Sequence, residues 1–265
     1  MNIKMIVMDL DGTLLHSDRE CSTNSMNYLR KLRDLGYIIV IATGRTLGSA
    51  LSKVNGNFFS SYIISNNGAI IYDVLNNRIL FESEIDSKVV SDIYYDVKDE
   101  IDSFTVTDDK FYYRYHSLNN MTSDDKEITN IESFLASANK IIHGCIEQKK
   151  NIDVYNLQQK LSHKYFLMDF LIMQDSFSDN KWIDFFKANT SKYNSIKTLA
   201  DLCNINNNNI VCFGDGLNDI SMITNCGIGV AMGNALMGVK EKADYVTLTN
   251  DEDGVVVFLT NKINL

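Results

Sequence analysis

The chain has 265 residues, of which 45% are hydrophobic and 22% charged, an ordinary balance for a globular protein that buries a core without disulfides. Lys and Arg number 25 against 34 Asp and Glu, so the formal net charge is −9. This balance argues against nucleic acid or an anionic membrane surface as the main partner, because both attract cationic proteins. A small anionic ligand remains compatible if a metal ion or locally concentrated positive charge binds it.

The cysteines and the N-terminal residues favour a cytoplasmic protein. The five cysteines are an odd number, form no Cys-x-x-Cys pair and lie partly inside apolar runs, so we expect reduced thiols. The N-terminal apolar run is too short for a signal peptide, and no stretch approaches the ~20 apolar residues that span a bilayer. The sequence lacks proline, so its turns must depend on Gly, Asn, Asp and Ser.

The first third of the chain alternates between strand and helix patterns. Residues 3–10 form an apolar run of strand length, and residues 22–35 carry apolar side chains at helical spacing until Gly36. Residues 37–42 are rich in β-branched side chains, and residues 63–64 lead into another turn. Near-continuous apolar strands that alternate with helices indicate a parallel sheet covered on both faces.

The middle of the chain, residues 83–187, has a different pattern with more paired strands and fewer helices. The expected elements here are a helix over 86–97, strands at 104–107 and 111–115, a strand near 141–142, a helix over 154–161, and strands at 165–173 and 182–186.

The last third returns to alternating elements. The sequence predicts a helix over 195–203, a strand at 210–213, a helix through 223, a strand at 228–231, a helix over 235–242, a strand at 245–248 and a helix over 251–259. The whole pattern predicts an α/β fold with a doubly wound parallel sheet. We expect residues 1–82 and 188–265 to form the core domain, with residues 83–187 as an inserted α+β domain.

Two aspartates follow the first predicted strand, in the segment Asp9-Leu10-Asp11-Gly12-Thr13. Residues i and i+2 of a strand point to the same side, so Asp9 and Asp11 would share one space at the edge where open α/β sheets bind ligands. Paired carboxylates repel unless a cation neutralises them, and all-oxygen ligands suit Mg²⁺. The plainer interpretation is a solvated acidic turn.

A second acidic cluster, Gly214-Asp215-Gly216-Leu217-Asn218-Asp219, also follows a predicted buried strand. A helix that begins near Gly216 would place Asp215 and Asp219 about one turn apart on the same side. The alternatives are a simple turn with a helix cap, or a dinucleotide-binding fingerprint. The fingerprint is disfavoured because Asp219 stands where that motif requires Gly or Ala.

Two other predicted strands end in Thr43-Gly44-Arg45 and Asn66-Asn67-Gly68. A hydroxyl, a close backbone N–H group and a guanidinium all suit a phosphate group. Thr43-Gly44 alone is more typical of an ordinary loop than of a phosphate site, and Lys192 alone is still more typical of a solvent-facing lysine.

Together these segments resemble the motifs of the haloacid dehalogenase-like (HAD) hydrolases, and among them the Cof-type phosphatases with a type-IIB (C2) cap. The resemblance covers essentially the whole chain. The matching stretches are Asp9-Leu10-Asp11-Gly12-Thr13-Leu14, Ala42-Thr43-Gly44-Arg45, Asn66-Asn67-Gly68-Ala69, Ser191-Lys192, residues 214–219 and residues 229–235.

The resemblance implies a Rossmann-like core, a C2 cap and a Mg²⁺-dependent phosphatase that acts on a small phosphorylated metabolite through a phospho-aspartyl intermediate. It implies that Asp9 is the nucleophile, and that Asp11 is the acid and base. Asp9, Asp11 through its carbonyl, Asp215 and Asp219 would bind or support Mg²⁺. The implied phosphate and substrate ligands are Leu10, Thr43, Gly44, Arg45, Asn67, Lys192 and Asn218, with Thr43 and Lys192 also acting in catalysis.

The sequence departs from the family pattern beside Lys192. Tyr193 replaces the usual glycine, and Lys187-Ala188-Asn189-Thr190 replaces a proline-bearing turn, so the path that delivers Lys192 is open to question. Within the cap, the aromatic side chains near Tyr113 and Tyr115 are expected to have one buried face, and Arg114 is the first basic side chain to test.

Two alternatives accompany the phosphatase hypothesis. A phosphomutase acting on a hexose phosphate would use the same residues but exclude water from the acyl phosphate. A catalytically silent metabolite-binding regulator would have lost at least one of Asp9, Asp11, Lys192 or Asp215, and all four are present. The four histidines have no metal-ligand spacing, and we expect His16 in a surface turn.

Overall fold

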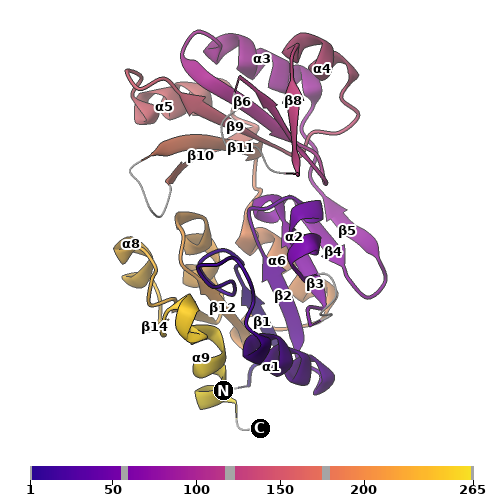
Figure 1. Cartoon of the computed structure of the whole chain (residues 1–265), viewed down its shortest axis with the longest axis vertical. Coiled ribbons are helices and arrows are strands. Elements are labelled where there is room, and N and C mark those ends of the chain that lie inside the picture. Colours follow the sequence, from indigo (N-terminus) through magenta and orange to yellow (C-terminus); the bar gives the residue numbers. More distant parts are fainter. Residues whose placement is uncertain (1, 55–58, 117–122, 175–179, 264–265) are drawn as a thin grey trace. The chain divides into compact units, whose positions relative to one another are not determined.

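The computed structural model describes residues 2–54, 59–116, 123–174 and 180–263. The chain divides into two compact units (Figure 1): unit 1 contains residues 1–81 and 191–265, and unit 2 contains residues 82–190. The junctions at 81/82 and 190/191 fall close to the sequence-based boundaries at 82/83 and 187/188.

Unit 1 is built on an eight-stranded sheet whose centre is parallel. The strand order is β14-β13-β12-β1-β2-β3-β4-β5, and β1 pairs in parallel with both β12 and β2. The α/β class predicted from the alternating pattern is therefore confirmed. The strands are β1 (Met5–Met8), β2 (Ile38–Ala42), β3 (Tyr62–Ser65), β4 (Ile70–Asp73), β5 (Arg78–Glu82), β12 (Ile210–Gly214), β13 (Ile228–Ala231) and β14 (Tyr245–Val246).

Both faces of the central strands β13, β12, β1 and β2 are buried, which explains their continuous apolar runs, whereas the edge strands β14 and β5 are largely exposed. Met5 and Val7 pack on the face that α6 and α7 cover. Ile6 and Met8, which alternate with them along β1, point to the opposite face and are equally buried. Helices α1 and α9 contact each other (Figure 1). The helices are α1 (Thr23–Asp34), α2 (Leu47–Val54), α6 (Lys192–Leu202), α7 (Ile220–Asn225), α8 (Met237–Lys240) and α9 (Gly254–Lys262).

Unit 1 differs from the sequence-based prediction in several places: helix α2 and strands β4 and β5 were not predicted, and α6 begins at Lys192 rather than at residue 195. Strand β4 runs antiparallel to β3, so the sheet is mixed at this side, because the tight turn at residues 66–69 reverses the chain. The last helix begins at Gly254 rather than at residue 251. Asp253 has a left-handed backbone with φ of 53°, which separates a short 3₁₀ turn at Asn250–Glu252 from α9.

Asp253 joins the start of α1 to the start of α9. Its carboxylate accepts hydrogen bonds from Ser22, Asn24 and Ser25 and lies 3.0 Å from Nε2 of His16. Burial alone would raise the pKa of Asp253, but these hydrogen bonds outweigh it and lower the pKa to about 2. His16 thus belongs to a structural contact between helices.

The described residues of unit 2 form a six-stranded sheet and three helices. The strand order is β10-β11-β9-β6-β7-β8, with antiparallel pairs except for β7 and β8. Strand β9 begins at His143, so the predicted strand at residues 141–142 is wrong in position. The elements are α3 (Ser87–Val97), β6 (Ile101–Thr107), β7 (Tyr112–Tyr115), β8 (Asp125–Ile128), α4 (Ile131–Ser137), β9 (His143–Gln148), α5 (Val154–Lys164), β10 (Met168–Gln174) and β11 (Lys181–Lys187).

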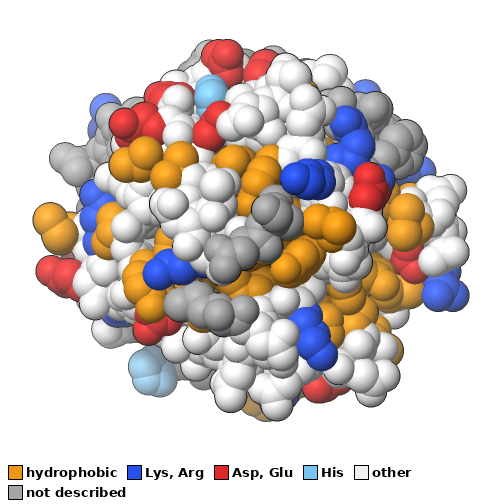
Figure 2. Space-filling view, turned by 90° about the horizontal axis from the view of Figure 1, so that it is seen from below, with side chains coloured by type: hydrophobic (Ala, Val, Ile, Leu, Met, Phe, Trp, Pro, Cys, Tyr) orange, Lys and Arg blue, Asp and Glu red, His pale blue; other side chains and the backbone are white. Residues whose placement is uncertain are grey.

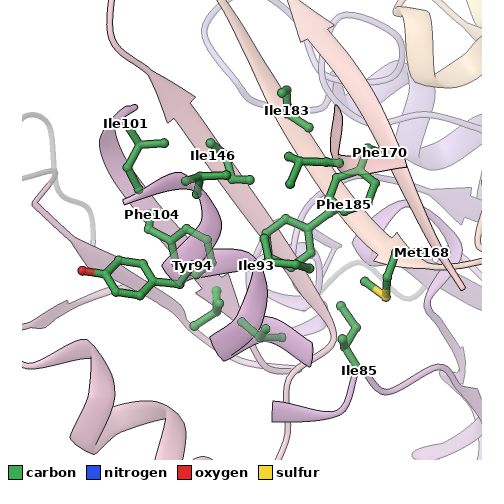
Figure 3. Close-up of a cluster of buried hydrophobic side chains, with 14 of the residues drawn as sticks. Ile85, Ile93, Tyr94, Ile101, Phe104, Ile146, Met168, Phe170, Ile183 and Phe185 are labelled. Carbon is green, nitrogen blue, oxygen red and sulfur yellow. The ribbon is translucent and has the colours of Figure 1, made fainter. Parts of the chain in front are cut away.

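The helices of unit 2 and one face of its sheet enclose a separate hydrophobic core, in which Phe104 and Phe185 are fully buried (Figure 3). Tyr113 and Tyr115 pack against this core, as their alternation predicts. Arg114 forms an ion pair with the buried carboxylate of Asp125.

The surface carries no continuous charge of one sign on the face shown in Figure 2, where hydrophobic side chains lie among basic and acidic ones. Among the residues that the structure describes, no helix is long and apolar enough to cross a membrane.

We predict that Gly144→Ala destabilises unit 2. A Cβ at this position would lie 1.9 Å from Cζ of the buried Phe185, so the core would have to shift, at a cost of about 1–3 kcal/mol. The single tryptophan, Trp182, lies on β11 with Phe185, so its fluorescence during urea unfolding reports on this unit.

Gly238→Ala is the matched control, because a Cβ there meets nothing within 4 Å and the residue lies in a helix. Its unfolding midpoint is expected to stay level or rise slightly. Equal midpoints for wild type and Gly144→Ala would contradict the predicted overpacking.

Candidate active site

Four chain segments of unit 1 meet at the carboxyl ends of neighbouring strands. Asp9 follows β1, Thr43 follows β2, Asn66 follows β3 and Asp215 follows β12. Because these strands are parallel, their carboxyl ends lie at one edge of the sheet. The amide of Asp9 still donates to the carbonyl of Phe213 at 3.1 Å, so the sheet ladder fixes the position of the first aspartate.

Three buried carboxylates converge at this edge. Asp9, Asp215 and Asp219 each provide one oxygen atom, and these atoms lie within 4.8 Å of one another. Oδ2 of Asp219 accepts hydrogen bonds from the backbone amides of Asp215 and Gly216, both at 2.9 Å. A short 3₁₀ turn at Leu217–Asp219 folds Asp219 back onto the strand end, so α7 begins only at Ile220.

Lys192 connects two of these carboxylates. Its Nζ atom lies 2.7 Å from Oδ1 of Asp9 and 2.6 Å from Oδ1 of Asp219, and its side chain is fully buried. Lys192 is the first residue of α6, where the hydroxyl of Ser191 caps the helix by accepting from the amide of Asn194. The lysine is therefore delivered to the acidic cluster by the helix start.

The departures from the family pattern do not divert Lys192. Tyr193, in place of the usual glycine, packs partly buried against the core below the sheet. Gly68, with φ of +108°, lies directly against the approach to α6, since a Cβ there would be 2.3 Å from the carbonyl oxygen of Ser191. Ser195 donates a hydrogen bond to the carbonyl of Gly68 and holds the turn to the helix.

The electrostatics of the cluster favour a further cation. Burial raises the pKa of Asp9 well above its ordinary value, and the charges of Asp219, Asp215 and Asp11 add to this, against the opposing effect of Lys192. Burial and then the charge of Asp219 raise the pKa of Asp215 to about 7, although the hydroxyl of Thr13 lowers it. Burial alone would lower the pKa of Lys192, but its two carboxylate partners raise it. Three carboxylates thus face a single ammonium group.

Asp11 lies apart from the buried cluster and pairs with Arg45. Nε of Arg45 donates to Oδ2 of Asp11 and Nη2 donates to Oδ1, both at 2.6 Å. Half of the Asp11 side chain is exposed, compared with a fifth of the Arg45 side chain. The structure therefore places the side chain of Asp11 outside the set of carboxylates that could share one ion.

Polar groups from two other loops surround the strand ends. The amide of Asn67 donates to the carbonyl of Thr43 at 3.0 Å, and Nδ2 of Asn218 donates to Oδ1 of Asn67 at 2.8 Å. A Cβ on Gly44 would approach Oδ1 of Asn67 to 3.2 Å, so these loops are tightly packed. The predicted residues Thr43, Gly44, Asn67 and Asn218 are thus brought together. The Leu10 side chain is buried, and its carbonyl accepts the amides of residues 13–15.

Sequence reasoning missed three supporting residues. Thr13 donates its hydroxyl to Oδ1 of Asp215 at 2.9 Å. Gly12, with φ of +77°, allows the close approach of Asp215, since a Cβ would lie 2.3 Å from Oδ2. Asn234 donates to the carbonyl of Gly12 at 2.8 Å. All three lie inside stretches that the sequence singled out, but their partners are set by loop packing.

The chain belongs to the haloacid dehalogenase-like hydrolases, the family that matches residues 6–259. Within this family it is a Cof-type phosphatase, a hydrolase of phosphomonoesters. The chain is 33% identical to the phosphatase YwpJ of Bacillus subtilis, over 96% of this chain and 97% of that protein. It is 30% identical to the 5-amino-6-(5-phospho-D-ribitylamino)uracil phosphatase YcsE of the same organism, over 96% and 94%.

The fold comparison agrees with this assignment. A haloacid dehalogenase-like hydrolase from B. subtilis superimposes with a TM-score of 0.83 at 26% identity, over 99% of this chain and all of the other. A second such hydrolase, from Bacteroides thetaiotaomicron, gives a TM-score of 0.82 at 26% identity, over 98% of this chain and 100% of that one.

We predict that Lys192→Met destabilises the protein by about 3–5 kcal/mol, measured by urea unfolding at pH 8 in EDTA with far-UV circular dichroism as the readout. The substitution keeps the length of the side chain but leaves the buried Asp9 and Asp219 without their cationic partner.

Lys53→Met is the control, since Lys53 pairs with Glu20, whose side chain is 72% exposed. Loss of this pair is expected to change the free energy of unfolding by less than about 1 kcal/mol. Equal losses of unfolding free energy in Lys192→Met and Lys53→Met would show that the buried ion pairs of Lys192 stabilise the protein no more than an exposed ion pair does.

Proposed function

We propose that this chain is a Mg²⁺-dependent phosphatase that hydrolyses a small phosphorylated metabolite through a phospho-aspartyl intermediate. The observation that carries the proposal is the buried cluster of Asp9, Asp215 and Asp219 with Lys192 bridging two of its members at a strand edge. Phosphoryl transfer asks a protein mainly for positioning and for stabilisation of charge, and this cluster supplies both.

In the first step, an oxygen of Asp9 attacks the phosphorus atom and the ester P–O bond breaks. The leaving alkoxide takes a proton from Asp11, and the phosphoryl group stays on Asp9. In the second step, water attacks the phosphorus atom of the acyl phosphate and gives a proton to Asp11. The bond to Asp9 then breaks, and inorganic phosphate is released with both aspartates restored.

The phosphoryl oxygens need donors that offset the repulsion between an anionic ester and a carboxylate. Lys192 provides a buried positive charge that already contacts the attacking carboxylate. Thr43, Gly44, Asn67 and Asn218 provide hydroxyl, backbone and amide donors from tightly packed loops. We assign the same task to the amide of Leu10 and to the guanidinium of Arg45.

The acidic residues fit a divalent cation. Asp9 and Asp215, with the carbonyl of Asp11, would bind Mg²⁺, and Asp219 would support them; three buried carboxylates balanced by one lysine suit a hard, doubly charged ion. When bound, the ion supplies positive charge that stabilises the transferring phosphoryl group. The donor set is all oxygen, as Mg²⁺ prefers.

We assign substrate selection to unit 2 as the inserted cap. Its core is independent of unit 1, so its sheet can present a different set of side chains without altering the acidic cluster. Relatives named as phosphatases of 5-amino-6-(5-phospho-D-ribitylamino)uracil make this compound a first candidate, and sugar phosphates are the next class to test.

Replacing the nucleophile tests the proposal directly. Asp9→Asn is expected to lower the turnover of p-nitrophenyl phosphate with Mg²⁺ by ~10³-fold or more, because the amide cannot form the acyl phosphate. Asp34→Asn, an exposed aspartate that pairs with its neighbour Arg33, is the control and should keep wild-type turnover. Full turnover by Asp9→Asn would sink the assignment.

The cation requirement has its own test. Treatment with EDTA is expected to abolish turnover, and Mg²⁺ should restore it. Mg²⁺ at about 100 times its dissociation constant should also stabilise the wild type against unfolding by about 2.7 kcal/mol, because it binds the folded acidic cluster.

Asp215→Asn removes one of the three buried carboxylates, so it should lose most of this stabilisation, while Asp34→Asn should retain it. Activity in EDTA equal to that in Mg²⁺ would contradict the metal requirement.

A further inference from the structure

Arg45 and Asp11 form an ion pair that engages both oxygens of the carboxylate. Both carboxylate oxygens accept N–H groups of one guanidinium at 2.6 Å, in the two-pronged geometry that makes such pairs strong. A third arm of Arg45, Nη1, donates to the hydroxyl of Ser49 at 3.3 Å. Arg45 is therefore anchored on α2, and the more exposed Asp11 is tied to it.

The ion pair occupies groups that Asp11 and Arg45 would use during turnover. While both oxygens of Asp11 accept N–H groups of Arg45, the carboxyl group is held in contact with the guanidinium rather than with a leaving oxygen. The two guanidinium N–H groups that Asp11 occupies cannot at the same time hold a phosphoryl oxygen. The pair must therefore separate before the Nε and Nη2 donors of Arg45 can bind the phosphate group and before Asp11 can turn to the leaving oxygen.

The two side chains nevertheless lie next to the phosphate-binding loops and the acidic cluster. The amide of Arg45 donates to the hydroxyl of Thr43 at 3.2 Å, and its carbonyl accepts the amide of Asn66 at 2.8 Å. The charge of Asp11 is close enough to raise the pKa of both Asp9 and Asp215.

We propose that Arg45 exchanges partners during substrate binding: the phosphate group of the substrate takes the guanidinium from Asp11 and thereby frees Asp11 for proton transfer. Arg45 is then a phosphate ligand in the complex and a positioning residue for Asp11 without substrate. This inference rests on the proposed function, because it requires Asp11 to be the acid and base. A doubly charged phosphate competes well with a singly charged carboxylate for the same donors.

Exchange predicts a pattern of affinities that other roles of Arg45 do not. If the phosphate group must first break the ion pair, the binding free energy that it gains from Arg45 is reduced by the loss of the contact between Arg45 and Asp11. Removing Asp11 then makes Arg45 a better phosphate ligand. A plain phosphate ligand would contribute equally with or without Asp11, and a permanent clamp on Asp11 would contribute to phosphate binding in neither case.

Orthovanadate binding in Mg²⁺ tests this by calorimetry on four proteins: wild type, Arg45→Gln, Asp11→Asn and the double variant. We expect Arg45→Gln to weaken binding only about 2–3-fold when Asp11 is present, and about tenfold or more in the Asp11→Asn background. The same factor in both backgrounds, or a larger factor when Asp11 is present, would overturn the exchange.

Glu20→Gln is the matched control for charge, because it removes one carboxylate of an ion pair with Lys53 elsewhere in unit 1. In this background, Arg45→Gln should weaken binding by the same 2–3-fold as in the wild type. Arg45→Lys keeps the positive charge but loses the paired N–H donors of the guanidinium. In the Asp11→Asn background, its affinity for orthovanadate should be lower than that of the protein with Arg45 and higher than that of Arg45→Gln.

A crystal structure of the wild type with orthovanadate gives a second readout that needs no variant. The Arg45 nitrogens should contact the vanadate rather than Asp11, and an intact pair beside bound vanadate would overturn the proposal. Failure of the exchange is distinct from failure of the proposed function. In the first case turnover still depends on Asp9, and in the second the wild type hydrolyses no phosphate ester.

Discussion

A single buried ammonium group makes the arrangement of this protein possible. The parallel sheet brings Asp9 and Asp215 to one edge, and the turn after β12 adds Asp219. Without compensation, three carboxylates in a buried space would oppose folding by their mutual repulsion and their loss of hydration. Lys192 supplies part of that compensation, and the Mg²⁺ ion of the proposed function would supply the rest.

Close backbone packing permits this concentration of charge. Gly12 and Gly68 both have left-handed backbones, and each lies where a side chain would collide with a member of the site or its support. Gly12 makes room for Asp215, and Gly68 makes room for the chain that enters α6. The glycines therefore act through distance: they let the loops approach closely enough for the charged groups to interact strongly.

Much of this organisation could be predicted from the sequence because strand ends are informative. The apolar runs before Asp9, Thr43 and Asp215 predicted buried parallel strands, and parallel strands bring their ends to a common edge. The α/β class and the family followed from the same segments, and both are confirmed. The turn at Asn66-Asn67-Gly68 was identified, since these residues accept a left-handed backbone, but the antiparallel strand β4 that follows it was not, because a turn alone does not fix the pairing of the next segment.

The choice of partners among polar side chains was also beyond the sequence. The segment that contains Asp11 indicated a pair of aspartates sharing one space, but the Asp11 side chain instead pairs with Arg45 from another loop. Thr13 was seen as part of the first segment, yet its bond to Asp215 joins residues 202 positions apart. Such pairings depend on how loops pack in three dimensions, and a linear pattern does not record this.

The separate core of unit 2 has a consequence for how a family of such enzymes can diversify. Its apolar cluster lies within one continuous stretch of the chain, from Ile85 to Phe185, and shares no member with the core below the acidic cluster. Substitutions in this core therefore act on the stability of unit 2 and leave the charges around Lys192 unchanged. If unit 2 selects the substrate as proposed, substrate preference can change through substitutions in a module that folds around its own interior.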